Sequence, residues 1–431
     1  QMGMPNLSQL KVPEAPLPSE AMGDLEDVYK DLHRHPELGF HEARTAGIVA
    51  ERLRGLGFAV TEGVGKTGVV GIFERGEGPT VMMRADMDGL PVKEETGLPY
   101  ASKATFTRDD GTATPVMHAC GHDMHTTALL GACEALVTDD SWHGRLMVVF
   151  QPNEEQGAGA RAMLEDGLFE RFGTHEVVLG QHVGPLPAGV IGLRPGPAFA
   201  ASDAILIRIH GEGGHGSRPE TTVDPIVLAA SVVMRLQTVV SREVAASEMV
   251  VLTVGSINGG TAANIIPAEV ELKLSVRTFD AEIRERVLQA IERIVRGEAA
   301  AAGVKREPEI DSLYSFPAVV NGPQASEITT RAFHRAMPGV AVINPGAVTG
   351  SEDVGLFARA AGVPIVYWLL GGADPALFAH VKSMEDLVHT LAKIPSNHSP
   401  EYAPLLEPTL GIGINALKAA ALEWLAGPKP Q

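Results

Sequence analysis

The first half of the chain alternates short apolar runs with stretches whose apolar residues recur every three or four positions. Residues 68–73, 80–83, 146–150 and 177–179 are apolar without strict alternation, which is typical of strands buried on both faces. Helical periodicity covers residues 24–32, 42–56 and 127–136, and Gly57 stands where a helix commonly stops. Strands separated by helices predict an α/β domain with a mixed, mostly parallel sheet and flanking helices.

The pattern changes near residue 200. Residues 204–210 and 250–254 predict strands, and residues 225–240 predict a helix between them. Apolar and polar residues alternate along 269–277, which indicates an antiparallel sheet with one exposed face. An amphipathic helix is expected over 281–297. These elements predict a separate α+β module with β-α-β-β-α-β order at 200–316, inserted between two parts of the α/β domain, 21–199 and 317–431. A core strand at 363–369 indicates that the α/β pattern resumes after the module.

The composition of the chain argues against two classes of binding partner. The chain has 431 residues, a formal net charge of −18 and a sequence pI of about 5.3. This acidic balance argues against nucleic acid and against an anionic membrane surface, both of which select basic patches. No apolar run in the sequence reaches the roughly 18 residues that a membrane span needs. The compartment stays open between cytoplasmic and periplasmic or secreted, because the sequence begins at Gln1 with a Pro-rich, non-periodic segment.

Polar residues follow three of the predicted strands directly. Asp86 and Asp88 follow 80–83, Glu154 and Glu155 follow 146–150, and His182 follows 177–179. In open α/β sheets, sites form at the carboxyl ends of the strands. We therefore expect these side chains to meet at one edge of the sheet.

Residues 118–125 combine one thiol with several imidazoles at the start of a predicted helix. Cys120, His122 and the carboxylates after the strands are ligands that suit borderline-soft divalent metal ions. Asp123 could accept the second N–H of a metal-bound imidazole. Taken alone, the pair Cys120 and His122 is a weak signal, and a buried cysteine beside a loop histidine explains it better than a metal site does. A thiol hydrolase, with Cys120 as nucleophile and His122 or His125 as base, is a second interpretation.

The remaining candidates are individually weak. If Glu154 and Glu155 lie in an extended segment they point in opposite directions, so that one can bind a metal while the other acts as general base. The alternative is the acidic start of a helix. His182 and His398 in polar loops, and His215 between glycines, also fit ordinary surface positions.

Matched in order, these segments make the chain resemble a known family over almost its whole length. It is similar to the dinuclear metallopeptidases of the aminoacylase and glutamate carboxypeptidase type, within the amidohydrolase branch that includes hippurate hydrolases, N-acyl amino acid hydrolases and plant auxin-conjugate hydrolases. The matching segments are 35–40 (HPELGF), 84–91 (RADMDGLP), 118–125 (HACGHDMH), 151–155 (QPNEE), 213–215 (GGH), 259–267 (GGTAANIIP), 350–353 (GSED) and 397–398 (NH). Asn153, where the family usually has Ala, and Val354, where an aromatic residue is common, depart from the pattern.

The resemblance implies a zinc-exopeptidase-like catalytic domain and a role for each matched residue. Two divalent metal ions, most simply zinc or manganese but with cobalt or nickel possible, would be bound by Cys120, His122, Glu155, His182 and His398. Glu154 would be the general base, with Asp86 and Asp123 supporting the ligands. The inserted module would act as lid and dimerisation domain of a homodimer. Its residues His215, Asn264 and Arg277 would contact the substrate carboxylate or the developing oxyanion.

The expected activity is hydrolysis of the amide bond of N-acyl amino acids such as N-acetyl or N-benzoyl derivatives, by a metal-activated water. A metal-dependent dipeptidase or carboxypeptidase acting on short peptides is the alternative within the same chemistry. A non-catalytic, metal-dependent binder of amino acid derivatives is the alternative outside it.

Overall fold

The computed structural model describes residues 4–426, which divide into two compact units. The first unit comprises Gln1–Gly196, Asn321–Gly346 and Asp353–Gln431. The second comprises Pro197–Val320 and Ala347–Glu352. The chain therefore leaves the first unit twice, first to form most of the second unit and then to add the short segment Ala347–Glu352.

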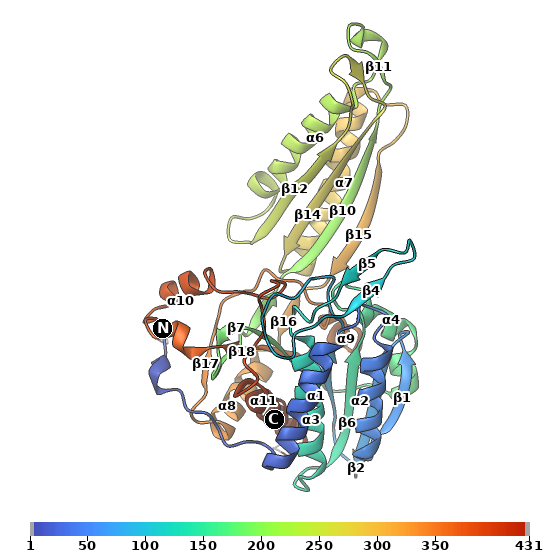
Figure 1. Cartoon of the computed structure of the whole chain (residues 1–431). Helices are drawn as coiled ribbons and strands as arrows, with labels where there is room; N and C mark the ends of the chain where they lie inside the picture. The colour runs from blue at the N-terminus through green and yellow to red at the C-terminus, as the bar shows by residue number, and fades with distance from the viewer. Residues whose placement is uncertain (1–3, 427–431) are drawn as a thin grey trace. The chain divides into compact units, whose positions relative to one another are not determined.

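The first unit is built on an eight-stranded sheet (Figure 1). Its strands lie in the order β1 (Ala59–Val64), β2 (Gly68–Arg75), β6 (Gly144–Gln151), β3 (Thr80–Asp86), β7 (Val177–Pro187), β18 (Ile365–Ala373), β8 (Val190–Gly192), β17 (Ala341–Ile343). β6, β3, β7 and β18 run parallel to one another, whereas β1, β2 and β6 pair antiparallel. The four parallel strands are almost continuously buried, which explains why they read as apolar runs without alternation.

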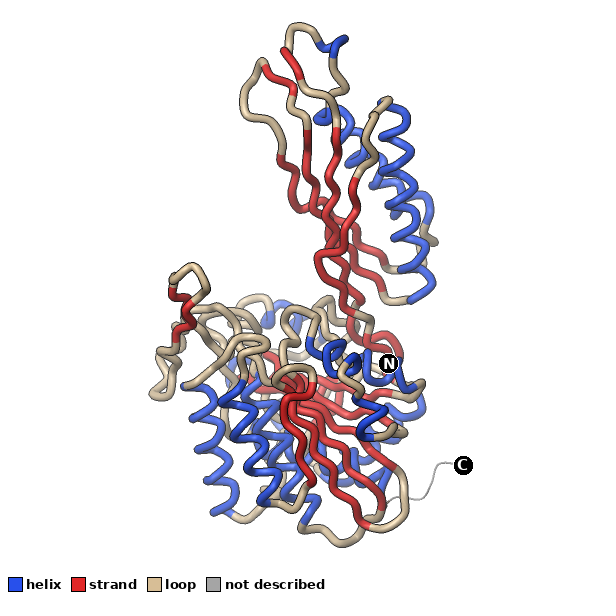
Figure 2. Tube along the Cα trace, turned by 90° about the vertical axis from the view of Figure 1, so that its right-hand side faces the viewer, coloured by secondary structure: helices blue, strands red, loops and turns tan. Residues whose placement is uncertain are grey.

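Helices flank this sheet (Figure 2). They are α1 (Ser19–Arg34), α2 (Ala43–Gly55), α3 (His122–Val137), α4 (Gly159–Glu165), α5 (Leu168–Phe172), α8 (Pro323–Ala336), α9 (Gly355–Ala361), α10 (Met384–Leu391) and α11 (Thr409–Leu425). α3 packs against α1, α2 and α11 and is buried along most of its length. Short elements complete the unit: η1 (Leu7–Gln9), η4 (Pro375–Phe378), and the pair β4 (Thr105–Thr107) and β5 (Ala113–Pro115).

The second unit has the β-α-β-β-α-β order expected from the sequence. Its antiparallel sheet runs β12 (Val250–Asn258), β14 (Glu269–Thr278), β10 (Ala201–His210), β15 (Glu309–Phe316). α6 (Pro225–Thr238) and α7 (Ala281–Ala302) cover one face of it. The other elements are β11 (Gly214–His215), η2 (Pro219–Thr221), η3 (Val239–Glu243) and β13 (Ile265–Ile266), and β9 (Gly196–Phe199) pairs with β16 (Val319–Asn321). The predicted fold class, a mixed α/β domain with an α+β insertion, is confirmed.

One helical stretch of the described residues, Pro225–Glu243, is long and apolar enough to cross a membrane by length and composition alone. Leu228, Val232 and Leu236 of this stretch pack on the sheet of the second unit. Core helices of soluble domains commonly pass the same criterion, and this packing accounts for the apolar face of α6.

Two local predictions were wrong. His182 lies inside β7, not in a loop after it, because β7 continues to Pro187. Glu154 and Glu155 occupy neither an extended segment nor a helix start. They lie in a turn, which begins at Asn153 with φ of 41° and is closed by the bond from the Gly157 N–H to the Glu154 carbonyl (2.7 Å).

Candidate metal centre

A glycine brings the start of α3 against β7. Gly121 stands just before α3 with φ of 74°, a left-handed conformation that suits glycine. A Cβ at this position would lie 2.2 Å from Cγ1 of Val183, so no larger residue fits without displacement. This close approach places Cys120 and His122, on either side of the glycine, beside His182 of β7.

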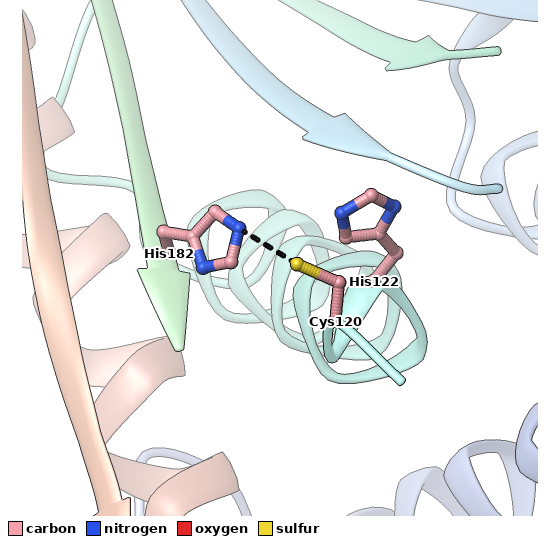
Figure 3. Close-up of side chains that lie close together, drawn as sticks. All are labelled: Cys120, His122 and His182. Carbon is pink, nitrogen blue, oxygen red and sulfur yellow. Dashed lines mark hydrogen bonds between the residues drawn. The ribbon is translucent and has the colours of Figure 1, made fainter. Parts of the chain in front are cut away.

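Cys120, His122 and His182 form the first group of possible ligands (Figure 3). Their ligand atoms all lie within 4.8 Å of one another. Cys120 Sγ and His182 Nε2 are 3.6 Å apart. Figure 3 shows the thiol between the two imidazoles, with the His182 ring directed toward it.

Both imidazoles have one nitrogen occupied by a protein acceptor. His122 Nδ1 donates to Asp88 Oδ1 (3.0 Å), and His182 Nδ1 donates to the backbone carbonyl of Val183 (2.8 Å). In each ring Nδ1 therefore carries a proton, and Nε2 is the nitrogen that can present a lone pair to a metal. This is the tautomer that a metal-binding histidine adopts when its second nitrogen is held by the protein.

Cys120, Glu155 and His398 form a second group, again with ligand atoms within 4.8 Å of one another. His398 has φ of 78°, and its backbone N–H donates to the Ala119 carbonyl (2.7 Å). His398 Nε2 lies 3.2 Å from Glu155 Oε2. The segment near the end of the chain is thereby tied to the segment that precedes α3, and the two groups share Cys120.

Glu154 lies beside both groups and is almost completely buried. Its Oε1 is 3.8 Å from His122 Nε2, and Glu154, Glu155 and His122 make a further group of possible ligands. The structure therefore brings together Cys120, His122, Glu154, Glu155, His182 and His398, all from the first unit.

Asp88 supports a ligand in each of the two groups. While Oδ1 binds His122, Oδ2 accepts the backbone N–H of Glu155 (3.0 Å). Asp86 contacts His125 Nδ1 (2.6 Å) and lies 3.2 Å from His122 Nε2. His125 in turn accepts the N–H of Val183 on Nε2 (2.8 Å), which anchors β7 next to His182.

Asp123 faces a different neighbour from the one expected. Its Oδ2 contacts His33 Nδ1 (2.7 Å) and its Oδ1 accepts the Met124 N–H (3.0 Å). His33 also contacts Glu94, and although burial alone would lower the pKa of His33, these two carboxylates raise it to about 10. Asp123 thus belongs to a buried ion-pair cluster beneath α3.

The electrostatic balance of the site calls for a cation. Burial and then the negative charges of Glu155 and Glu154 raise the pKa of the Cys120 thiol well above its ordinary value. Burial alone would lower the pKa of His122, but Asp86 and Asp88 outweigh it and raise that pKa well above the usual range. The hydrogen bond to Glu155 likewise raises the pKa of His398. Protons are held here by an excess of carboxylates, and a bound metal cation would replace them.

The donor atoms fit a divalent metal. His122 Nε2 and Glu155 Oε1 are buried and make no hydrogen bond within the described part of the chain, and they lie 3.4 Å apart. Buried polar atoms are nearly always bonded, so two such atoms without a hydrogen bond on converging side chains indicate a missing partner. One thiol, three imidazoles and a carboxylate suit zinc and neighbouring divalent ions.

The three residues expected to contact substrate lie in the second unit. His215 and Asn264 are exposed neighbours, because β11 pairs with β13 and the Gly216 N–H donates to the Asn264 carbonyl (2.8 Å). His215 Nδ1 accepts from the Ser217 hydroxyl (2.7 Å). Arg277 at the end of β14 donates to the Thr349 carbonyl (2.8 Å) and the Ser351 hydroxyl (2.9 Å).

Comparison with known proteins decides the family. Residues 82–397 match the peptidase family M20/M25/M40. The chain belongs to this family. Within it, the amidohydrolase branch provides close relatives: the hippurate hydrolase of Campylobacter jejuni is 39% identical over 346 residues, 79% of this chain and 86% of the relative. The N-acyl-L-amino acid amidohydrolase of Geobacillus stearothermophilus is 41% identical over 296 residues, 68% of this chain and 76% of the relative.

A solved structure of the M20 family extends the comparison. A Bacillus subtilis protein described as a dinuclear metal binding peptidase is 28% identical, with a TM-score of 0.74 over 94% of this chain and all of that chain. The protein is therefore an M20-family hydrolase of the amidohydrolase branch.

Three residues around this M20 site were not identified from the sequence as supports: Asp88, His125 and Glu42. Asp88 was noted only as following a strand, and His125 only as a possible base. Glu42, described below, falls where an acidic helix start is commonplace. A signal for Asp88 exists in the spacing Asp86-Met87-Asp88, which places two carboxylates on one side of the strand end.

Proposed function

We propose that this protein hydrolyses the amide bond of N-acyl amino acids, using two divalent metal ions held by Cys120, His122, Glu155, His182 and His398. The observation that carries the proposal is the presence of two ligand groups that share Cys120 and lie beside the buried carboxylate of Glu154. As a thiolate, Cys120 would belong to the ligand sets of both ions. The relatives named for hippurate and N-acyl amino acids favour this substrate class.

When bound, the metal ions would supply Lewis-acid chemistry, lowering the pKa of a coordinated water from about 15.7 toward 7 and polarising the amide carbonyl. Glu154 lies close enough to His122 to face the same space as the ligands. It takes a proton from the attacking water and passes that proton to the nitrogen of the departing amino acid.

The alternative in which Cys120 is a nucleophile finds less support. The imidazole facing Cys120 is that of His182, not His122 or His125, and burial followed by the surrounding carboxylates raises the pKa of the thiol. An activated thiol needs the opposite, a lowered pKa. The same surroundings suit a thiolate that is formed by metal binding.

We also propose that the protein is a homodimer associating through the second unit. The strand β12 lies at the edge of its sheet. It carries exposed apolar residues, Val251 and Ile257, and α6 adds Val227 and Met234. Edge strands with apolar side chains pair readily with another chain. In such a dimer the substrate carboxylate or the oxyanion would be bound by His215, Asn264 and Arg277. Some of these residues would act on the active site of the other subunit.

The test is a substrate panel on metal-reconstituted protein. N-acetyl, N-benzoyl and longer N-acyl amino acids should be hydrolysed faster than dipeptides. Chelation with EDTA should abolish the activity, and zinc or manganese should restore it. Activity that survives complete metal removal but is lost with iodoacetamide would overturn the proposal in favour of the thiol mechanism. A preference for dipeptides would make the protein a peptidase.

A further inference from the structure

We propose that Glu42 is a positioning residue that holds the backbone turn carrying Glu154, and this inference rests on the role of general base proposed for Glu154. Glu42 comes from the segment between α1 and α2 and is completely buried. It occupies the position before the first residue of α2, yet its side chain makes no capping bond to that helix. The carboxylate is directed elsewhere.

The Glu42 carboxylate contacts the turn that follows β6. Its Oε2 accepts the backbone N–H of Asn153 at 2.7 Å. Its Oε1 accepts the hydroxyl of Thr67 at 2.8 Å, which fixes the plane of the carboxylate. The Asn153 N–H belongs to the peptide unit between Pro152 and Asn153, so the contact holds the backbone one residue before the proposed base.

The turn needs such a contact because its backbone is strained. Asn153 has φ of 41°, a region that non-glycine residues seldom occupy, although Asn tolerates it better than most. Such conformations persist only where the surroundings hold them. The side chain of Asn153 donates from Nδ2 to Gln156 Oε1 (2.9 Å). A Cβ on Gly39 would lie 2.0 Å from Asn153 Oδ1, so the absence of a side chain at Gly39 makes room for this arrangement.

Two buried carboxylates therefore hold the backbone before and after Glu154. Glu42 binds the N–H of Asn153, and Asp88 binds the N–H of Glu155. With the amides of Asn153 and Glu155 held, the backbone between them, which carries the Glu154 side chain, is restricted. Glu42 acts through this turn and not on the substrate itself.

The cost of burying Glu42 supports a role beyond fold stability. Burial and then the negative charge of Asp88 raise the pKa of the Glu42 carboxyl to about 7. A buried ionisable group without a cationic partner usually lowers stability. A buried carboxylate at position 42 is explained if it orients the catalytic group Glu154.

Kinetics of Glu42 variants of the metal-loaded enzyme test the proposal. Glu42→Ala should lower kcat about 10- to 100-fold, the range expected when a catalytic group is displaced by up to an ångström, while KM changes less than about threefold. Glu42→Gln keeps an oxygen that can accept from the Asn153 N–H and should restore part of the loss. In a Glu154→Gln background, Glu42→Ala should lower the residual rate less than about threefold, because there is no base left to orient.

Glu37→Gln is the matched control. Glu37 is a carboxylate of the same segment that accepts from the Thr45 N–H (2.7 Å) and the Arg44 N–H (3.0 Å), and thus supports the start of α2 without touching the Glu154 turn. It should lower thermal stability and leave kcat per folded molecule unchanged. Equal kinetic effects of Glu37→Gln and Glu42→Gln, or an undiminished effect of Glu42→Ala in the Glu154→Gln background, would overturn the proposal.

Hydrogen exchange of the metal-free protein provides a readout that does not depend on activity. Glu42→Ala should speed amide exchange in residues 151–159 and leave the first turn of α2 unchanged, whereas Glu37→Gln should do the reverse. Unchanged exchange in 151–159 would show that Glu42 does not hold the turn. If Glu42→Ala fails to fold, Thr67→Val can replace it, because it removes the hydroxyl that donates to Glu42 Oε1. It should lower kcat and speed amide exchange in residues 151–159 in the same directions, each by about threefold. If the wild-type enzyme hydrolyses no N-acyl amino acid, the proposed function is overturned, and the exchange measurement alone decides whether Glu42 holds the turn.

Discussion

Replacing Asp88 should weaken the binding of both metal ions, because this one carboxylate supports a ligand in each group. Asp88 is buried and accepts from His122 Nδ1 and from the Glu155 N–H, both at 3.0 Å. Asp88→Ala leaves two buried donors without acceptors, at about 1–3 kcal/mol each. Losing one outer partner of a metal ligand typically lowers affinity 10- to 100-fold, or about 1.4–2.7 kcal/mol. With a partner lost in each group, we expect each of the two dissociation constants to rise by at least about tenfold.

Asp88→Asn should give an intermediate effect. The amide retains one acceptor oxygen, so it can hold either His122 or the Glu155 N–H but not both. Competition titration of the metal-free protein against a chromophoric chelator would measure both dissociation constants. The control is Asp123→Asn, which alters a buried carboxylate next to His122 in sequence but bonded to His33. It should change metal affinity less than about threefold while lowering stability.

Wild-type affinity for two ions in folded Asp88→Ala protein would show that Asp88 does not support the ligands. A rise in only one of the two dissociation constants would contradict the double role of Asp88, because the structure gives it a contact in both groups. An equal loss of affinity in Asp123→Asn would mean that the charge of the whole region, and not the two hydrogen bonds, sets metal affinity.

Three further predictions concern the base, the dimer and pH. Glu154→Gln should bind both metal ions but lose at least about 10²-fold in kcat; calorimetry and steady-state kinetics on the same preparation would check this, and retained turnover would remove Glu154 from the mechanism. Mixing His215→Ala with Glu154→Gln protein should restore part of the activity through hybrid dimers, and no recovery despite verified subunit exchange would place the whole site in one protomer. Burial lowers the pKa of His175 to about 4. In the unfolded chain His175 binds its proton near pH 6.5, whereas in the folded protein it stays neutral down to about pH 4. Protonation of the unfolded chain therefore lowers the free energy of unfolding as the pH falls from 6.5 toward 4, by up to about 3 kcal/mol. Urea unfolding of metal-free wild type and His175→Gln between about pH 7 and pH 4.5 should show a shallower fall for the variant, and identical slopes would contradict the assignment.

The sequence predicted the strands of the first unit well because their burial is nearly uniform. β3, β6 and β7 are apolar for physical reasons that need no tertiary information, since each is covered on both faces. The sequence-based prediction of where β7 ends was wrong, because polar residues continue inside the strand. Gln181 is buried there, donating to the Gly413 carbonyl (3.1 Å) and accepting from Trp368 Nε1 (3.0 Å). No pattern along the sequence can show that these distant partners will satisfy it.

The same limit explains which supporting residues were missed. The candidate ligands could be found because cysteine, histidine and acidic residues are recognisable in a sequence as residues that bind metals. A supporting carboxylate such as Asp88 or Glu42 is recognised only by what it contacts, and those contacts join residues 67 and 111 positions apart. Asp123 illustrates the converse: adjacent to His122 in sequence, it turns away to bind His33 because neighbouring residues of a helix point in different directions.

The contacts between segments suggest that the site is formed before any metal binds. Each segment that bears a candidate ligand or the base has a backbone group held by another segment. The His398 N–H is bound by the Ala119 carbonyl, the Val183 N–H by His125, the Glu155 N–H by Asp88 and the Asn153 N–H by Glu42. These bonds need no cation to form. The hydrophobic core of the first unit also surrounds these bonds. Metal binding should therefore add stability through mass action. It should not be required for folding, as it is in a zinc finger. Preformed geometry of this kind is what a hydrolytic site needs, since groups already in place require little reorganisation during the reaction.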